Sequence, residues 1–315
     1  MATSQEVAFL HSYRQDFELV YQQTLSQLYS TVRNESQNVL SDFYGYLGAI
    51  EDDFDAAEAE HYADTQWTEV EHLRRRVTLA HKDKALPLSK PDQQAMGPYD
   101  PTGGYVRLLT AYFARWYDYK CLQAMGATAY TGVAGATEVN NYDDGECRLM
   151  DGDGTWATAG SDHSATTDTA LTVAKLNDLA GMMTDAKVPA DNRYIAVNDY
   201  QLTGLFEDST FGAEEIREIR DIKTRKMGQF MGFTFVVLST DLFTANTTDA
   251  TCIECYAWHR DAVVMATGKG TYAPELDIAP RPDKKNVKQI FTDAYAGGTR
   301  LQGPGVIEIL LRGAA

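Results

Sequence analysis

The sequence predicts an α+β fold with a smaller α/β part nested inside it. Three observations support this class. A long helix is expected from Tyr105 to Met125, a helix–strand–helix run follows at 172–208, and the chain beyond residue 230 is rich in β-branched and aromatic residues. The order of these elements is therefore that of an α+β protein with a nested α/β part.

The composition is that of an acidic globular protein. The chain has 315 residues, of which 44% are hydrophobic and 23% charged, enough for two domains or one elaborate one. Its formal net charge is −17, from 45 acidic and 28 basic residues. Because clusters of Lys and Arg bind nucleic-acid phosphates, this balance disfavours a protein that grasps DNA or RNA, although not one that merely encloses it.

The first residues lack the basic flank and apolar block of a signal peptide, and no apolar run reaches transmembrane length. We therefore expect a cytosolic product without a membrane span.

The first 90 residues are too polar to form a core of their own. Residues 5 to about 33 carry apolar side chains at helical spacing and predict a helical arm that packs on something else. Residues 37–90 combine an acidic block, Glu51 to Glu60, with the basic block Arg74 to Arg76. Strand-like alternation in "RRVTLAH" and "ALPLS" predicts a long two-stranded excursion, with Pro87 at an edge or in a loop.

The helix expected at 105–125 would be roughly 30 Å long at 1.5 Å per residue. One broad apolar stripe is expected to face the core, with Arg107, Arg115, Asp118 and Gln123 largely off it. The stripe consists of Tyr105, Leu108, Leu109, Tyr112, Phe113, Trp116, Leu122 and Met125.

The second half of the chain alternates helices and strands. Thr172 is the expected N-cap of a helix that ends before Pro189, and the strand "RYIAVN" and the helix "DYQLTGLFED" follow. "GFTFVVLST" and "YAWHRDAVVMAT" predict further strands. The terminal stretch "NVKQIFTDAYAGGTRLQGPGVIEILLRG" predicts two strands joined by a glycine-rich turn.

Two Glu-x-x-His units, Glu58–His61 and Glu69–His72, are the strongest metal-site pattern. In di-iron bundles such units come from different, facing helices. Here they are 11 residues apart, which would separate them by about 16 Å on one helix. We interpret them as a solvated charged surface and expect no metal.

The cysteines offer a second possible chemistry. Cys252 and Cys255 form a CxxC, but their flanks predict a strand, which would point the two sulfurs to opposite faces. Cys121 is expected as a small core residue of the long helix. "DGDGTW", from Asp151 to Trp156, lacks the Gly and Glu that a calcium loop needs and predicts a hairpin turn.

No phosphate-binding loop or nucleophile elbow is present, and the histidines are scattered. We expect no catalytic residue and no cofactor.

Four stretches carry a resemblance to a known family. They are the run "RRVTLAH" to "ATAYTG" through the long helix, the segment "LTVAKLND" to "GLFED", the strands "MGQFMGFTFVVLST" and "YAWHRDAVVMATGKG", and the terminal "IFTDAYAGGTRLQGPGVIEILLRG". Together, in this order, they resemble the major capsid proteins of tailed bacteriophages, which share the Hong Kong phage-type capsid fold.

The resemblance implies a division into named parts. These are an N-terminal arm (1–36), an extended loop (37–90), a peripheral domain with its spine helix (91–129), an axial domain (130–268), and the C-terminal strands of the peripheral domain (269–315).

The resemblance further implies a structural protein, a major capsid subunit that self-assembles into an icosahedral shell around phage double-stranded DNA. Its expected partners are copies of itself in hexamers and pentamers, together with scaffold, decoration and portal proteins. It would be assembled in the host bacterial cytoplasm and reside in the virion capsid.

Two sets of residues follow from this reading. The expected inter-subunit contacts are Glu51, Asp52, Asp53, Arg74, Arg75 and Arg76, and the expected spine-helix core is Leu108, Tyr112, Phe113 and Trp116. Two alternatives stay open: an encapsulin-like nanocompartment shell encoded by a host, and a cytosolic metal- or thiol-dependent enzyme.

Overall fold

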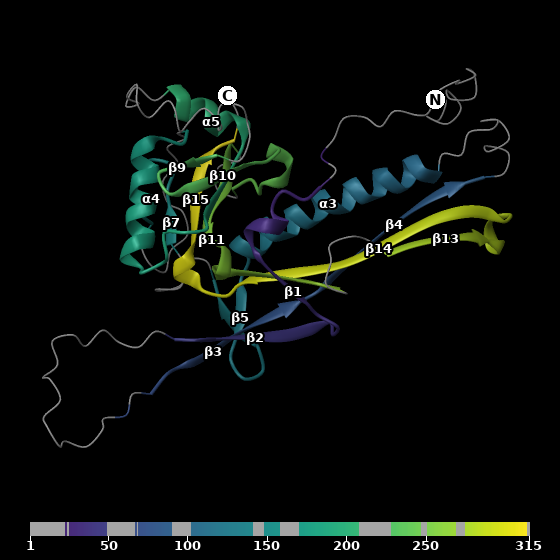
Figure 1. Cartoon of the computed structure of the whole chain (residues 1–315), viewed down its shortest axis with the longest axis horizontal. Helices are drawn as coiled ribbons and strands as arrows, with labels where there is room; N and C mark the ends of the chain where they lie inside the picture. The colour runs from purple at the N-terminus through teal and green to yellow at the C-terminus, as the bar shows by residue number, and fades with distance from the viewer. Residues whose placement is uncertain are drawn as a thin grey trace, which may run out of the picture.

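The computed structural model describes residues 23, 25–48, 67, 69–89, 102–140, 148–157, 170–207, 228–246, 251–268 and 275–313. Within them, three α-helices combine with three β-sheets (Figure 1), which confirms the α+β class. The helices are α3 (Thr102–Gly126), α4 (Val173–Asp185) and α5 (Asp199–Glu207). In Figure 1, α3 lies along long strands on one side of the molecule, and α4 and α5 lie on the other.

A six-stranded sheet carries much of the hydrophobic core. β8 and β10 are parallel, whereas β11 runs antiparallel to both β8 and β15. The strand order is β7 (Arg148–Met150), β15 (Val306–Arg312), β11 (Cys252–His259), β8 (Arg193–Val197), β10 (Phe233–Val237) and β9 (Gln229–Phe230).

Helix α4 contributes Leu176, Leu179 and Met183 to this core. Thr172 caps the helix by accepting a hydrogen bond from the Lys175 amide. The helix–strand–helix prediction for 172–208 is therefore confirmed in α4, β8 and α5.

A five-stranded sheet is built around the long strand β14. β12 pairs with the C-terminal part of β14, β13 pairs with its N-terminal part, and β4 runs antiparallel along most of its length. Helix α3 packs on β14. The strands are β1 (Arg33–Ser36), β12 (Val263–Thr267), β14 (Val287–Arg300), β13 (Glu275–Arg281) and β4 (Ala80–Leu88).

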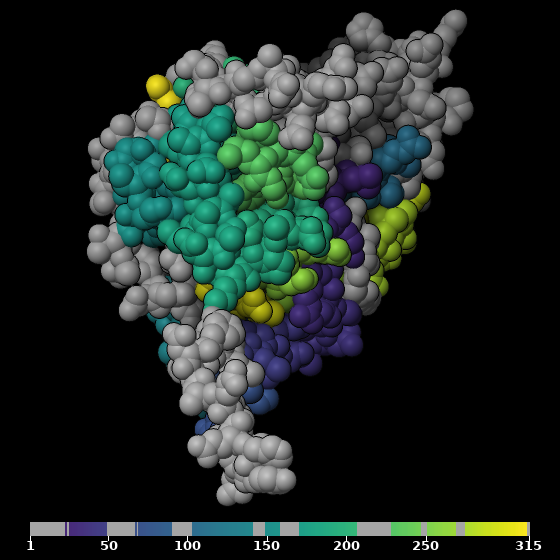
Figure 2. Space-filling model, turned by 60° about the vertical axis from the view of Figure 1, so that its left-hand side comes forward, coloured from purple at the N-terminus to yellow at the C-terminus, as the bar shows by residue number. Residues whose placement is uncertain are grey.

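A four-stranded sheet forms the base of the predicted excursion. Its order is β2 (Ser41–Leu47), β3 (His72–Thr78), β5 (Ala129–Thr131) and β6 (Thr137–Val139). β2 and β3 pair antiparallel from Ser41 opposite Thr78 to Leu47 opposite His72, so two strands are paired here. The predicted strand "ALPLS" is not one of them, because it lies in β4, which pairs with β14 of the five-stranded sheet. Figure 2 shows the purple surface of residues 25–48 below the teal and green surface of α4 and its neighbours.

Short 3₁₀ turns connect several elements. They are η1 (Tyr29–Thr31), η3 (Thr240–Leu242), η4 (Arg260–Ala262), η6 (Pro282–Lys284) and η7 (Gly303–Gly305).

The segment from Asp151 to Trp156 is a turn in which the Gly154 amide donates to Asp151 O, and Met150 and Trp156 form an antiparallel bridge. The hairpin-turn prediction is confirmed.

The helical prediction for residues 5–33 is wrong at its C-terminal end. Residues 29–31 form a 3₁₀ turn, and Arg33 begins strand β1. The reason is long-range pairing: β1 lies parallel to β12, and the Trp258 indole N–H donates to Thr31 O at 3.0 Å. Tertiary hydrogen bonds outweigh weak local helical spacing. Residues 1–22 lie outside the described part of the chain.

The prediction of two terminal strands joined by a glycine-rich turn is confirmed in β14, η7 and β15. The two strands do not pair with each other, because η7 carries the chain from the five-stranded sheet to the six-stranded one. A second crossing, η4 between β11 and β12, lies beside it, and the Leu301 amide donates to Ala262 O at 2.8 Å. The strands of 269–315 are thus divided between two sheets, and β12 pairs with β14 rather than with the strands of 130–259.

Helix α3 buries a different arc from the one expected. Leu109, Phe113, Leu122 and Met125 are buried as predicted, but Leu108 is 40% exposed, so its assignment to the core is wrong. Tyr112 and Trp116 are half-buried, whereas the fully buried residues include Tyr117, Asp118 and Cys121. The buried arc is rotated because β14 covers one side of the helix, and Gln27 and Leu28 contact another side at Asp118.

Candidate assembly surfaces

The basic block of strand β3 is held against aromatic rings of its own chain. The Arg74 guanidinium carbon lies 5.0 Å from the centroid of Phe43 on β2, and its Nε donates to Gly132 O at 3.1 Å. The Arg76 guanidinium carbon lies 4.8 Å from the Tyr130 centroid on β5. Cation–π contacts of this kind order both side chains on one face of the sheet.

Gly135 closes the turn over this pair. Its φ of +62° lies in the left-handed region, and a Cβ there would stand 2.9 Å from both the Arg76 Cδ and the Phe43 Cε1. Only glycine allows both the backbone conformation and the close approach.

Arg75 points to the opposite face, as alternation along a strand requires. It is only 3% exposed, so it is not presented to another subunit, and its place among the contact candidates is corrected. Glu51, Asp52 and Asp53 lie outside the described residues, as does the unit Glu58–His61.

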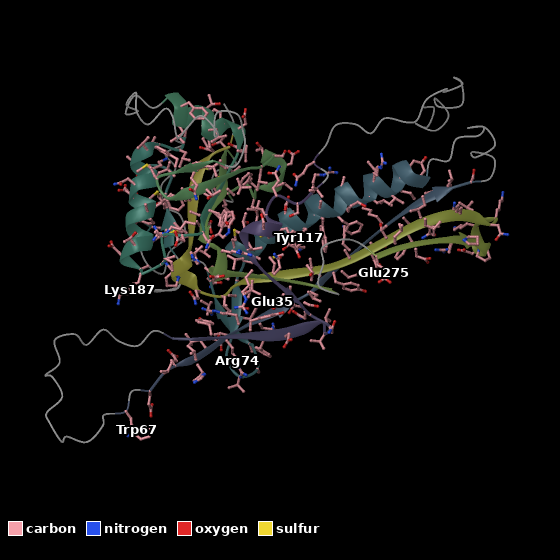
Figure 3. The ribbon with its side chains drawn as sticks, in the orientation of Figure 1. Glu35, Trp67, Arg74, Tyr117, Lys187 and Glu275 are labelled. Carbon is pink, nitrogen blue, oxygen red and sulfur yellow. The ribbon has the colours of Figure 1, made fainter. Side chains whose placement is uncertain are left out.

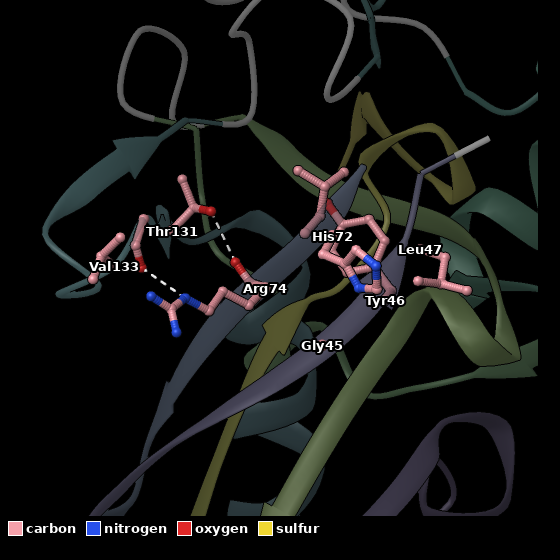
Figure 4. A pocket seen from close by; sticks show the side chains of 9 residues that line it. Gly45, Tyr46, Leu47, His72, Arg74, Thr131 and Val133 are labelled. Atoms are coloured by element: carbon pink, nitrogen blue, oxygen red, sulfur yellow. Dashed lines mark hydrogen bonds between the residues drawn. The ribbon is translucent and has the colours of Figure 1, made fainter. Parts of the chain in front are cut away.

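A groove of about 570 Å³ opens beside Arg74 (Figure 4). Its rim is apolar and open to solvent, since Leu47 is 62% exposed and Val133 89% exposed. The Thr131 hydroxyl donates to Arg74 O at 2.8 Å and so joins β5 to β3 in the lining of the groove. An apolar rim beside a guanidinium suits a protein surface that brings both apolar side chains and carboxylates. The lining residues are Gly45, Tyr46, Leu47, His72, Leu73, Arg74, Thr131, Gly132 and Val133.

A second hollow, of about 530 Å³, lies between α3, β4 and η3. Half-buried aromatic rings of α3 line it together with four basic side chains, and Asp241 is the acidic residue of the lining. Sequence reasoning missed this site, because it assigned Tyr112 and Trp116 to the stripe that faces the core. The lining residues are Ala80, His81, Lys82, Tyr112, Arg115, Trp116, Tyr119, Lys120, Asp241 and Leu242.

Asp118 binds the arm to α3 through four residues between 23 and 28. Its carboxylate accepts hydrogen bonds from the Gln23 side-chain amide and the Ser26 hydroxyl, both at 2.5 Å, and from the backbone amides of Gln27 at 3.1 Å and Leu28 at 3.2 Å. Burial raises the pKa of this carboxyl, and the hydrogen bonds, that from Ser26 first, counteract part of the rise.

The thiols are placed as structural groups. Cys252 and Cys255 lie on β11, which confirms the predicted strand, and both are buried, as is Cys121. Burial raises the pKa of Cys255, and the nearby carboxylates of Glu254 and Glu308 raise it further. Burial likewise raises the pKa of Cys121. Neutral buried thiols are poor nucleophiles.

Among the described residues, no group of three or more His, Cys, Asp or Glu side chains is placed to hold a metal ion. In the same residues, no helix is both long and apolar enough to cross a membrane.

Comparison with known proteins matches the chain to one family over nearly its full length. A family model described as phage capsid protein covers residues 6–312. No curated protein matches the chain.

Solved phage shells share the fold. The capsid of Ralstonia phage GP4 is 13% identical, with a TM-score of 0.68 over 96% of this chain and 95% of that one. The head of Helicobacter pylori bacteriophage KHP40 is 12% identical, with a TM-score of 0.64 over 96% and 95%. The capsid of cyanophage Pam1 is 14% identical, with a TM-score of 0.64 over 100% and 98%.

The tailed-phage capsid fold expected from the resemblance is confirmed by these structures. Their low identities speak only to the fold, whereas the family model spans nearly the whole sequence. The chain belongs to the phage capsid protein family.

Proposed function

We propose that this chain is the major capsid subunit of a tailed phage, and that its copies assemble through hexamers and pentamers into an icosahedral shell around double-stranded DNA. The family match over residues 6–312 carries the proposal. The domain limits given above for arm, extended loop, peripheral domain and axial domain belong to the same proposal. Scaffold, decoration and portal proteins are proposed as further partners, and the host cytoplasm as the place of assembly.

The exposed side chains of the excursion support a role in assembly. Leu47 and Phe43 on β2 are exposed, and Trp67, which precedes β3 and lies away from the sheets in Figure 3, is 94% exposed. Exposed apolar surface costs roughly 25 cal/mol per Å² relative to burial. Contact with a neighbouring copy would recover that free energy, which a monomer cannot do.

Arg74 and Arg76 stay proposed as inter-subunit contacts, with Glu51, Asp52 and Asp53 as acidic counterparts on a neighbour. Their aromatic supports fix both guanidinium groups before any partner binds, so little side-chain entropy remains to be lost. Each exposed pair contributes at most about 1 kcal/mol. A closed shell repeats each contact by symmetry, so small contributions add up.

The acidity suits a container for DNA. A net charge of −17 disfavours tight binding to phosphates, so a packed genome could leave. We propose no catalytic activity for the chain beyond assembly.

Negative-stain electron microscopy with sedimentation velocity on the purified protein tests the proposal. Closed shells, or rings of five or six subunits, are expected. A species that remains monomeric or dimeric at high concentration, even with the scaffold and other products of its own phage present, would contradict it. Nucleic acid extracted from shells made during infection should be double-stranded DNA; enzyme cargo instead would point to a nanocompartment.

Charge reversal tests the contact residues. Arg74→Glu with Arg76→Glu should lower the yield of shells and weaken the salt dependence of assembly. Lys187→Glu with Arg260→Glu, two exposed positions beside the six-stranded sheet, is the matched control. Unchanged yield and salt dependence in the β3 variant would remove these arginines from the interface, provided that its isolated subunit still folds.

A further inference from the structure

The basic hollow beside α3 lies where the N-terminal arm joins the body. Arg115 lines the hollow, and its Nη1 donates to Gln23 O at 3.3 Å. One turn along the helix, the Asp118 carboxylate binds Gln23 and Ser26. Gln23 is therefore fixed at the edge of the hollow, and the preceding residues are covalently joined to the body at this point.

The hollow combines aromatic and cationic surface in an otherwise acidic protein. Tyr112, Trp116 and Tyr119 are half-buried and form its wall, and His81, Lys82, Arg115 and Lys120 supply basic groups. The Lys120 amino nitrogen lies 5.9 Å from the Tyr119 ring centroid. Such a lining fits a short peptide with alternating apolar and acidic side chains.

The arm contains such a peptide close to its anchored end. Residues 16–21 read "DFELVY", with carboxylates at Asp16 and Glu18 and with apolar side chains at the other four positions. Seven extended residues span at most about 25 Å, so Asp16 stays within that distance of Gln23. A tether this short gives the segment an effective concentration in the millimolar range at the hollow.

We propose that the hollow between α3, β4 and η3 docks residues 16–21 of the same chain. Phe17 and its apolar neighbours would pack on the rings of Tyr112, Trp116 and Tyr119. Asp16 and Glu18 would face Lys82 and Lys120. The proposal concerns the arm of a single subunit and does not depend on shell formation.

Photo-crosslinking in the full-length protein tests the docking directly. A benzophenone amino acid replaces Tyr119, which lines the hollow, and adducts are mapped by peptide mass spectrometry after denaturing electrophoresis. Adducts within residues 16–21, in a band of monomer mass, are expected. The same label at Tyr200 on α5 should give none, since that residue lies outside the hollow.

Charge-reversal variants provide a second test of the docking. Asp16→Lys with Glu18→Lys should lower the crosslink yield about fivefold, the effect of reversing two exposed pairs. Lys82→Glu with Lys120→Glu in the same protein should restore it. The control Glu6→Lys, ten residues before Asp16, should leave the yield unchanged.

Three results would overturn the proposal: adducts that map outside 16–21, a yield unchanged by the Asp16 and Glu18 reversal, or adducts at 16–21 only in a band of dimer mass. The last would assign the hollow to the arm of a second copy. Because shells are scored separately by microscopy, failure here is distinguishable from failure of the capsid function. Circular dichroism of each variant controls for folding.

Discussion

Strands β15 and β2 are both seven residues long, yet they have opposite surroundings. Six residues of β15 are buried between β11 and β7, whereas in β2 every residue is exposed or half-buried. The first strand is stabilised by its own chain through apolar burial. The second lies at an edge, with Phe43 and Leu47 exposed to solvent and one partner strand, β3. The comparison teaches that one region is complete in the monomer and that the other is built to be completed by contact.

The largest expected change in unfolding free energy comes from replacing a buried tryptophan, and an exposed tryptophan of the excursion serves as its comparison. Trp258→Ala should lower the free energy of unfolding by about 3–5 kcal/mol, because it empties a fully buried site and removes the hydrogen bond to Thr31 O. Trp67→Ala in the excursion should change it by no more than about 0.5 kcal/mol. Denaturant unfolding of the unassembled subunit measures both, and equal costs would break the comparison.

Asp118 lies where the arm contacts the core, and its removal should cause the second largest loss of unfolding free energy. Asp118→Ala leaves the buried amide of Leu28 and the part-buried amide of Gln27 without their acceptor, at a cost of about 2–3 kcal/mol. Limited proteolysis should then cleave the arm faster. Ser30→Ala, at an exposed position of η1, is the control and should leave the cleavage rate unchanged. Slow cleavage in both variants would mean that other contacts hold the arm.

The same carboxyl predicts a pH dependence. Its pKa is raised in the folded state, so the unfolded state ionises first, and the stability contributed by protonated Asp118 is lost as pH rises from about 4 through the raised pKa. The difference in unfolding free energy between wild type and Asp118→Asn should therefore shrink over that window. A difference that grows with pH would show that the hydrogen bonds outweigh the burial.

Replacement of two glycines by alanine should change the stability in opposite directions. Gly135→Ala should cost about 1–2 kcal/mol, because it combines a left-handed backbone with contacts to Arg76 and Phe43. Gly181→Ala, in α4 with no atom within 4 Å of its added Cβ, should stabilise the protein by up to about 1 kcal/mol. Thermal unfolding measures both changes in stability. Higher stability of Gly135→Ala would contradict the close contact of this turn with Arg76.

The smallest expected effect is on the excursion itself. Phe43→Ala removes the ring beneath Arg74 and should cost the isolated subunit about 0.5–1 kcal/mol. Its effect on shell yield should be greater, because an unsupported Arg74 loses its fixed orientation. Tyr200→Ala, a partly buried aromatic residue of α5, is the control for assembly. A stability loss without any change in yield would place Phe43 outside the interface.

Local signals predicted much of the fold. The Thr172 cap and the apolar spacing of α4 are contained in a few neighbouring residues, so the helix–strand–helix run could be predicted. Strands β10, β11 and β12 followed from their β-branched and aromatic content. Strands β3 and β4 followed from alternation, but β2, the partner of β3, was not predicted.

Long-range partners decided the rest. Arg33 begins a strand because it pairs with Val264, more than two hundred residues away, and no local pattern contains that information. Leu108 and Phe113 lie on one wide apolar stripe, so periodicity could not tell which of its edges faces β14. Arg75 lies between two surface arginines, and its burial follows from the strand's orientation. The hollow beside α3 required three separate elements to be brought together.

Hydrogen exchange of the β2, β3, β11 and β15 amides, measured before and after assembly, tests whether neighbouring copies complete the excursion. We expect the β11 and β15 amides to be protected in both states, whereas the β2 amides should exchange rapidly in the subunit and become protected in the shell. Protection of β2 that is already equal to that of β15 in the unassembled subunit, or that does not change on assembly, would contradict the claim that neighbours complete the excursion.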